Sequence, residues 1–413
     1  MGCTSSISRR CVVGRRRKRS TVPMVAIFVP SLRVPTSVDL VRPLRGLVSR
    51  DIVDRMSALR SRVVLLAEVD TSSVVSELKH ALEEYLPALL GFISKGKQLD
   101  GLVEFKWKNL EDDEQETCLA SAWYELLAVM HMRAMLSLLE ANMAFIPKDS
   151  SDDSESHGSE DSKKAAIVLL LKASGYLNYC INHILPRFPL QIRRRLPHDL
   201  QDGVLEATCI QALGQGIEMQ LGLAIESDNA TLPVKRRLAC EQVSYFAQAH
   251  YCLSGCITNE AYGKKHVLFL KWKYLGAKAS AYYYHGLLLG KGHEPSNHVN
   301  AAYSHFAADE FLLDSKRACL SFCLAVPVTR VPPVWGVMKH LHKKIPEVAS
   351  RKSHMYGYLL DQERASQTLP DLPEFSLSLK PDDFELPDID SSWEGEKCHP
   401  QAQSLKEHLM DVD

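Results

Sequence analysis

The chain has 413 residues, of which 46% are hydrophobic and 24% charged, and its formal net charge is −1. This balance predicts a protein that buries a large core, and it excludes a globally basic chain of the kind that binds nucleic acid. Its eleven cysteines follow no spacing framework, so we expect free thiols in a reducing compartment. No uninterrupted apolar run reaches the roughly 18 residues that span a bilayer, and we expect no transmembrane segment.

The first six residues, Met1-Gly2-Cys3-Thr4-Ser5-Ser6, fit the N-myristoylation pattern, in which Gly2 is the acceptor once Met1 is removed. Cys3 is placed for a second acyl chain. A basic cluster follows: Arg9, Arg10, Arg15, Arg16, Arg17, Lys18 and Arg19. One myristoyl chain binds membranes reversibly with about 10⁴ M⁻¹, and each basic residue near an anionic leaflet adds roughly 1 kcal/mol. We therefore expect residues 1–24 to be a disordered, acylated basic leader that binds an anionic membrane surface.

Three other interpretations of the leader stay open. The stretch contains no acidic residue before Asp39 and is rich in Arg and Ser, which is also typical of an organelle transit peptide. A basic cluster of this kind also occurs in nuclear-import and nucleic-acid-binding segments. The third interpretation is that the Met-Gly start arose by chance.

Apolar residues recur with the helical period of 3.6 along most of the chain. The predicted helices cover residues 49–69, 72–92, 113–145, 163–184, 200–225, 233–259, 265–289, 297–324 and 334–367. Between the second and third helices, residues 102–107 alternate apolar with polar after Val103, which indicates a strand of a small sheet. Long helices with short connections suggest antiparallel pairs stacked into a solenoid. The stretch from Trp272 to Gly276 is similar to the opening of a tetratricopeptide repeat.

Two acidic segments interrupt or follow the helices. Residues 148–164 place acidic side chains among serines and contain too little apolar surface to order themselves, so we expect a disordered loop between two helices. Beyond Pro370, further prolines and interleaved acids end the helical pattern. We expect one domain at residues 25–375 and an acidic tail at residues 376–413.

Patterns typical of catalysis are almost absent. Gly214-Gln215-Gly216 has Met219 in place of a third glycine and lies inside a helical pattern instead of following a strand, so it does not predict a dinucleotide site. We expect no enzymatic activity, no cofactor and no small-molecule substrate.

The spacing of two cysteine pairs is compatible with a metal site. Cys252 with Cys256, and Cys319 with Cys323, lie four residues apart, so each pair shares a helix face and in principle ligates zinc together with His250 or His266. Cysteine pairs that bind zinc are usually separated by two residues on a turn. Small apolar thiols that pack a helix interface are the better interpretation, and we expect no metal.

The helix at residues 200–225 carries a stripe at four-residue spacing. Its members are Leu205, Cys209, Leu213, Ile217, Leu221 and Ile225. With 3.6 residues per turn, this spacing drifts by about 40° at each step, so the six side chains cannot face one flat core. We expect Leu205, Cys209 and Leu213 to line a hydrophobic groove for the amphipathic helix of a partner. The alternative is core packing along the whole helix.

At this helix, Leu213-Gly214-Gln215-Gly216-Ile217-Glu218 resembles the Leu-Ala-Gln-Ala-Gln-Glu segment of the Bro domain shared by Alix, rhophilin and Brox. Further similar segments occur in family order: residues 105–107, 172–177, 235–239 and 277–285. Residues 355–360 look most like the Brox branch. The resemblance covers about residues 25–375. Gly214 and Ile217 depart from the family segment, and the chain ends in Met410-Asp411-Val412-Asp413 without a prenylation cysteine, so any lipid is expected at the N-terminus.

The resemblance implies an all-α, boomerang-shaped helical solenoid with a tetratricopeptide-like core and a small β-sheet. It also implies binding of the C-terminal amphipathic helix of an ESCRT-III subunit in endosomal sorting. With the leader, we expect a membrane-anchored, non-enzymatic adaptor that is cytoplasmic and peripheral on endosomal or plasma membrane. The alternative is a helical-repeat scaffold that binds a small GTPase or signalling protein.

Replacing the acceptor glycine tests the leader. Gly2→Ala removes myristate, so Cys3 has no stable membrane encounter at which to be acylated, and the protein should move to the soluble fraction on cell fractionation. Cys3→Ser should weaken anchoring but leave transient binding, because one chain and the basic cluster remain. Full membrane retention of Gly2→Ala would contradict the lipid anchor, and cleavage of the first thirty or so residues would favour a transit peptide.

Overall fold

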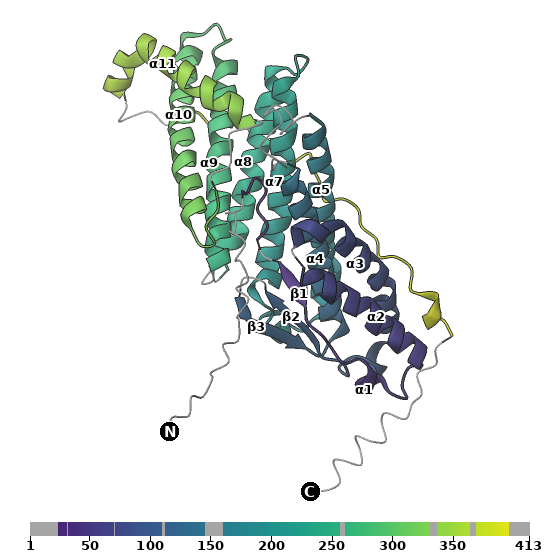
Figure 1. The fold of residues 1–413 in the computed structure, drawn as a ribbon. Coiled ribbons are helices and arrows are strands. Elements are labelled where there is room, and N and C mark those ends of the chain that lie inside the picture. The colour runs from purple at the N-terminus through teal and green to yellow at the C-terminus, as the bar shows by residue number, and fades with distance from the viewer. Residues whose placement is uncertain are drawn as a thin grey trace, which may run out of the picture.

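The computed structural model describes residues 24–30, 32–69, 71–109, 112–144, 160–256, 261–330, 337–363 and 369–395. They form a stack of long helices with a small sheet near one end (Figure 1). The helices are α1 Val41–Leu44, α2 Arg50–Ala67, α3 Thr71–Ser94, α4 Ala122–Met143, α5 Glu160–Tyr179, α6 Leu190–Arg193, α7 Asp202–Glu226, α8 Leu232–Ser254, α9 Ala261–Leu289, α10 Pro295–Leu324 and α11 Val337–Glu363. The strands are β1 Arg33–Pro35, β2 Phe105–Asn109 and β3 Asp112–Leu119, antiparallel in the order β1-β2-β3.

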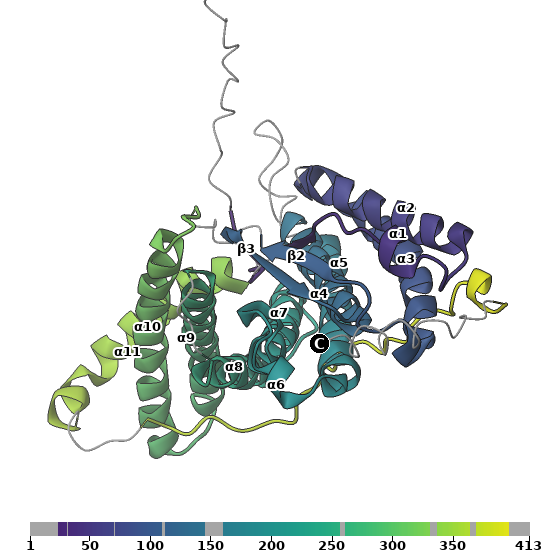
Figure 2. The same cartoon turned by 90° about the horizontal axis from the view of Figure 1, so that it is seen from below.

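Helices that follow one another in the chain are also neighbours in space. α4 packs on α5, α5 on α7, α7 on α8, α8 on α9 and α9 on α10, and Figure 2 shows this order from below. The pair α2 and α3 lies beside α4 and is inclined to the stack, which gives the molecule a bent outline (Figure 1). The predicted helical solenoid with a small sheet is therefore confirmed.

The helix predicted at residues 113–145 begins later than expected. Residues 112–119 form β3, and α4 starts only at Ala122. The register pairs Trp107 of β2 with Thr117, and Trp107 is fully buried. The backbone of β2 needs a hydrogen-bonding partner on this side, and supplying that partner overrides the local helical pattern.

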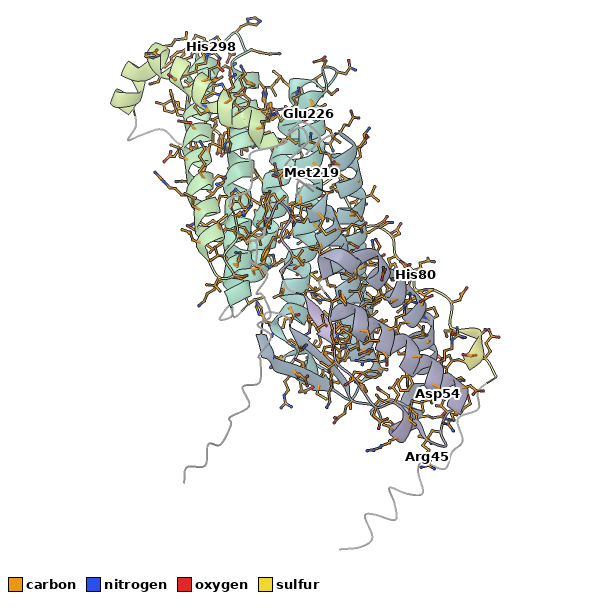
Figure 3. The ribbon with its side chains drawn as sticks, in the orientation of Figure 1. Arg45, Asp54, His80, Met219, Glu226 and His298 are labelled. Carbon is orange, nitrogen blue, oxygen red and sulfur yellow. The ribbon has the colours of Figure 1, made fainter. Side chains whose placement is uncertain are left out.

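The loop predicted at residues 148–164 is also shorter than expected. α5 begins at Glu160, so residues 160–164 form its first turn instead of a disordered segment, whereas residues 148–159 lie outside the described residues. Lys163 is only 1% exposed and pairs with Glu226 at the end of α7, which Figure 3 labels. Packing between α4 and α7, together with this ion pair, orders the turn.

One segment of the described residues, Glu160–Arg187, is long and apolar enough to cross a membrane by length and composition alone. Its helix α5 packs against α4 on one side and α7 on the other.

A buried carboxylate joins the sheet to the first helices. Glu125 of α4 accepts hydrogen bonds from Arg60 Nε at 2.8 Å, Tyr85 Oη at 3.1 Å and Trp107 Nε1 at 2.6 Å. Both ionic partners are buried, Arg60 at 3% and Glu125 at 0% side-chain exposure. Since Arg60 lies on α2, Tyr85 on α3 and Trp107 on β2, one carboxylate fixes four elements together.

Residues 369–395, which we call the strap, cross the stack as an extended chain after α11. The strap contacts α8, α7, α5 and α3 in turn. Figure 2 shows it as the yellow-green chain that runs from beside α10 past α8 and α6 to the side of α3. Phe384 packs edge-on against Tyr176 and Tyr179, with ring centroids 5.0 and 5.4 Å apart. At its end Trp393 is 2% exposed and packs against Phe92. The strap therefore crosses the boundary that we placed at residue 375, and residues 376–395 pack on the helices.

Three glycines make room for the strap where it crosses the helices. A Cβ on Gly216 of α7 would lie 2.9 Å from Leu379 Cδ1, and one on Gly175 of α5 would lie 2.5 Å from the carbonyl oxygen of Asp382. A Cβ on Gly91 of α3 would meet the ring of Trp393. Each of these glycines weakens its helix by up to about 1 kcal/mol relative to alanine, and each permits a close approach of the strap.

Removing the charge of Glu125 tests the buried cluster. Glu125→Gln leaves the Arg60 charge buried without its counter-ion, which should lower the free energy of unfolding by about 3–5 kcal/mol. The measurement is urea unfolding followed by circular dichroism. The matched control is Glu84→Gln, which breaks an ion pair with Arg62 whose side chains are 48% and 38% exposed, and should cost less than about 1 kcal/mol. Equal losses in both variants would contradict the role of Glu125.

Filling the space at Gly175 tests the position of the strap. Gly175→Ala forces the strap backbone away and should break the hydrogen bond from the Asp382 amide to the Leu171 carbonyl, 3.3 Å long in the structure. Hydrogen exchange in peptides covering residues 377–386 should become about tenfold faster. Gly357→Ala on α11, where a new Cβ meets nothing within 4 Å, is the control and should leave this exchange unchanged. Unchanged exchange in both variants would show that the strap is not held at Gly175.

Candidate partner-binding surface

Helix α7 is covered on nearly all sides. It packs between α5 and α8, and α11 touches it as well. On a further side, Gln211 Nε2 donates to the carbonyl of Phe28 at 2.9 Å, and Gln215 Nε2 donates to that of Ala26 at 3.3 Å. Burial lowers the pKa of His266 of α9 to about 3, so its neutral ring donates from Nε2 to Gln211 Oε1 at 2.7 Å. α7 is therefore the central helix of the stack.

The three residues expected to line an open groove are buried instead. Leu205 is 1% exposed, Cys209 5% and Leu213 6%. Leu205 and Cys209 belong to the main core with α4 and α5, where Cys209 Sγ donates to the carbonyl of Ser174 at 3.4 Å. The drift of the stripe around α7 is real, but other elements cover the directions in which Leu205, Cys209 and Leu213 point. The expected exposure is thus wrong.

Around Leu213 an apolar cluster reaches the surface. Its buried members are Leu213, Ile217 and Tyr245, and its half-buried rim consists of Leu171, Ile210, Leu238, Leu377 and Leu379. We call this set the Leu213 cluster. Two of its rim leucines, Leu377 and Leu379, come from the strap, so part of what covers Leu213 is an extended segment without helix or strand. Among the three predicted site residues, Leu213 is the one that shares its cluster with Leu377 and Leu379.

A small polar group fastens the strap beside the Leu213 cluster. Ser378 donates to Glu241 Oε2 of α8 from its backbone nitrogen at 2.9 Å and from Oγ at 2.6 Å. The other oxygen of Glu241 accepts from Arg237 Nε at 2.8 Å. Tyr245 Oη donates to the carbonyl of Leu379 at 2.7 Å. Burial, together with the nearby charge of Glu241, raises the pKa of Tyr245 to about 12, so this donor keeps its proton.

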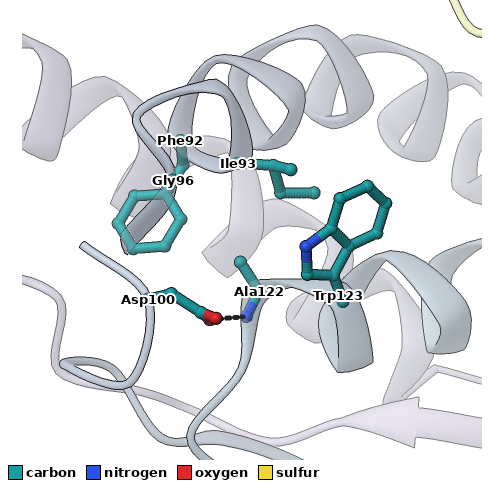
Figure 4. A pocket seen from close by; sticks show the side chains of 6 residues that line it. All are labelled: Phe92, Ile93, Gly96, Asp100, Ala122 and Trp123. Atoms are coloured by element: carbon teal, nitrogen blue, oxygen red, sulfur yellow. Dashed lines mark hydrogen bonds between the residues drawn. The ribbon is translucent and has the colours of Figure 1, made fainter. Parts of the chain in front are cut away.

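A hollow of about 150 Å³ lies elsewhere, between the end of α3 and the start of α4 (Figure 4). Its walls are Phe92, Ile93, Gly96, Ala122 and Trp123, with Asp100 as the charged member. The carboxylate of Asp100 accepts from the backbone nitrogen of Ala122 at 3.4 Å and so caps α4. A single carboxylate used as a helix cap does not indicate catalysis.

The side chains of both cysteine pairs pack against neighbouring helices. Cys319 and Cys323 are buried against Phe269 and Phe322, and Cys252 and Cys256 are half-buried between α8 and the start of α7. No group of three or more His, Cys, Asp or Glu side chains that could hold a metal ion occurs among the residues that the structure describes. The zinc interpretation therefore has no support in these residues.

The predicted lipidation residues Gly2 and Cys3 and the basic cluster Arg9–Arg19 lie outside the described residues, which begin at Met24. The segment that follows the leader is fixed to the helices. The amides of Ala26 and Ile27 donate to Asn142 Oδ1 at 2.8 and 2.9 Å. The first described residues are thus held beside α4 and α7.

Sequence reasoning missed the strap residues of the Leu213 cluster. The signal was present as a strand-like alternation, in which Phe375, Leu377 and Leu379 are half-buried and Ser376, Ser378 and Lys380 are exposed. This period of two indicates an extended chain with one covered face. The prolines and acids around it made the segment look like a solvated tail.

Comparisons with known proteins agree with this architecture. The model of the BRO1-like domain family matches residues 27–320. A comparison with the sequences of curated proteins gives no significant match. Among solved structures, ALIX in complex with the SIVmac239 PYKEVTEDL late domain is 16% identical, with a TM-score of 0.64, over 95% of this chain and 53% of that one. This chain thus spans about half the length of that ALIX chain.

Two further solved structures match this chain over nearly the whole of their own length. One, described as the structural basis for endosomal targeting by the Bro1 domain, is 14% identical, with a TM-score of 0.56, over 95% of this chain and 97% of that one. The ALIX BRO1 CHMP4C complex is 17% identical, with a TM-score of 0.59, over 89% of this chain and 97% of that one. At these identities the structures establish the fold, and the likeness to the Brox branch stays a prediction.

The family model covers well over half of the chain, and the helical stack, the small sheet and their order match those of the Bro domain structures. The chain belongs to the BRO1-like domain family.

Proposed function

We propose that the protein is a non-enzymatic adaptor of the ESCRT machinery, which binds the C-terminal amphipathic helix of an ESCRT-III subunit at the Leu213 cluster. The observation that carries the proposal is the half-buried apolar rim around Leu213 and Ile217, two residues of the helix segment that resembles the Bro domain. Membership of the BRO1-like domain family supports it. A similar structure, that of ALIX BRO1, was solved as a CHMP4C complex.

The chemistry of the rim suits an amphipathic helix. Leu171 of α5 and Ile210 of α7 provide half-buried apolar side chains on neighbouring helices, beside Leu377 and Leu379 of the strap. A partner helix would place the apolar side chains of one face against Leu171 and Ile210 and toward Leu213 beneath them. Exposed Lys172 lies next to Leu171 in the chain, and so offers a charge for the polar border of the same helix.

We also propose that the leader holds the adaptor, as a cytoplasmic protein, on the surface of endosomal or plasma membrane. The myristoylation pattern at Gly2, the adjacent Cys3 and the basic cluster support this. The segment that follows the leader is tied to α4, because Ala26 and Ile27 donate to Asn142. Such attachment would present the helical stack to ESCRT-III subunits at the membrane.

A charge on the rim tests the binding site. Leu171→Asp should weaken binding of an ESCRT-III C-terminal helix peptide by at least about tenfold, because a carboxylate then faces the apolar side of the helix and loses water on binding. The measurement is a binding isotherm on the full chain. The matched control is Leu320→Asp on α10, where the leucine is 51% exposed and away from the cluster, and where binding should not change.

Circular dichroism of each variant must accompany the isotherms. If Leu171→Asp proves unfolded, Leu171→Ala replaces it, with a smaller expected loss. A folded Leu171 variant that binds the peptide as tightly as the original chain would overturn the placement. Binding of a small GTPase from a panel, without binding of any ESCRT-III peptide, would favour the alternative scaffold function.

A further inference from the structure

The hydroxyl of Ser378 lies in an unusual position for a surface serine. Ser378 is exposed on the strap, yet its Oγ donates at 2.6 Å to Glu241, whose side chain is fully buried. The amide of Ser378 donates to the same oxygen at 2.9 Å. A residue that solvent reaches is thus tied directly to a buried negative charge.

We propose that Ser378 is a phosphorylation site, and that a phosphate there releases the strap from the Leu213 cluster. The reaction is transfer from ATP by a protein serine kinase. A bond forms between Ser378 Oγ and the γ-phosphorus, the bond from that phosphorus to the bridging β–γ oxygen breaks, ADP leaves, and the hydroxyl proton passes to a base of the kinase. Where it concerns partner binding, this inference rests on the function proposed above.

Phosphate changes both parts of the contact with Glu241. It removes the O–H donor, and it places about −1.5 to −2 charges beside the carboxylate. Arg237 brings a single positive charge, already bonded to Glu241, and is 49% exposed. A further cation near the strap is Arg236, whose Cζ lies 5.9 Å from the ring centroid of Phe375. Two acids with one committed arginine leave an excess of negative charge, and repulsion favours detachment of the strap.

The strap is built so that it can open locally. From residue 369 to residue 390 it forms neither helix nor strand, and around Ser378 only a few side-chain and backbone hydrogen bonds hold it to α5 and α8. Segments of this kind open at lower free energy than the helices beneath them. Local opening also presents Ser378 as an extended chain, the form in which a kinase binds its substrate.

Release would uncover apolar surface. Leu377 and Leu379 lie directly before and after Ser378, and both are rim members of the Leu213 cluster. Once they leave, Leu213 and Ile217, now 6% and 0% exposed, become open to a partner. The phosphate would therefore open the site on which the proposed partner helix packs.

Ser376 provides a matched control on the same strap. It is exposed like Ser378 and lies two residues earlier in the same alternation. In the part of the chain that the structure describes, Glu241 accepts from Ser378 and Arg237, and Ser376 is not among its partners. A phosphate at position 376 adds the same charge to the strap without replacing the contact with Glu241.

The test uses full chains with phosphoserine inserted during synthesis at position 378 or at position 376. With phosphoserine at 378, hydrogen exchange in peptides covering residues 376–383 should be at least about tenfold faster than in the unmodified chain, and at 376 it should be nearly unchanged. Ser378→Ala, which removes only the hydroxyl donor, should give a smaller increase. Unchanged or slower exchange with phosphoserine at 378 would overturn the release, and slower exchange would mean that Arg236 or Arg237 fastens the phosphate.

A second measurement addresses the acceptor itself. The full chain is incubated with ATP and a cytosolic extract that contains protein serine kinases, and phosphopeptides are mapped by mass spectrometry. Phosphate on Ser378 is expected, and in the Ser378→Ala chain it should be absent from this peptide. Modification elsewhere with none on Ser378 would overturn its role as an acceptor.

Binding of ESCRT-III C-terminal peptides separates this inference from the proposed function. Phosphoserine at 378 should tighten binding by about fivefold or more, because the strap no longer competes for Leu213. Faster exchange with weaker binding would overturn the opening of the site and make the strap part of the binding surface. Faster exchange with no peptide bound by either chain would uphold strap release and sink the proposed partner.

Discussion

The structure depends most on the burial of α7 in the middle of the stack. A helix that is apolar over most of its circumference must be covered on most sides, and two neighbouring helices cannot do this. Here α5 and α8 cover two sides, and residues 26–28 bond to Gln211 and Gln215 on another. The strap covers a further side at Gly216, and α11 also touches the helix. Segments from both ends of the described chain are therefore needed to complete the surroundings of one central helix.

An extended strap differs chemically from another helix as a cover for α7, because its backbone needs hydrogen-bonding partners. A helix satisfies its own backbone, whereas an extended chain must find partners on the surface beneath it. The strap finds them in Glu241, in Tyr245 and in the carbonyl of Leu171. These contacts are few and lie partly in solvent, so the strap is the cover of α7 that can open while the stack stays folded.

Much of the fold could be predicted because helical period and strand alternation are local signals. Nearly every long helix lies close to its predicted bounds, and the order of the weak family-like segments indicates the correct family and fold. The strand β3 could not be found, because its pairing with Trp107 of β2 decides its conformation. Lys163 pairs with Glu226, which lies far along the chain. This ion pair stabilises a helical turn where the local sequence predicts a loop.

Prediction of the candidate site is limited for the same reason, because contacts distant in the chain decide it. The drift of the stripe on α7 correctly indicated that its residues face several directions, but a single helix does not reveal what lies in each of them. Leu205 and Cys209 meet α4 and α5, which the sequence places nearby. Leu213 meets Leu377 and Leu379, more than 150 residues later in a segment with the composition of a tail.

The helix glycines carry information that composition alone does not. Gly91, Gly175 and Gly216 are spread over three helices, and no local rule connects them. In the structure each faces a different residue of one strap, Trp393, Asp382 and Leu379 in turn. A glycine inside a long helix costs stability unless something approaches closely, so three such glycines along one line across a helical stack indicate a crossing chain. The same close approach holds Ser378 against α8, and it links the chemistry of a surface serine to the apolar cluster beneath it.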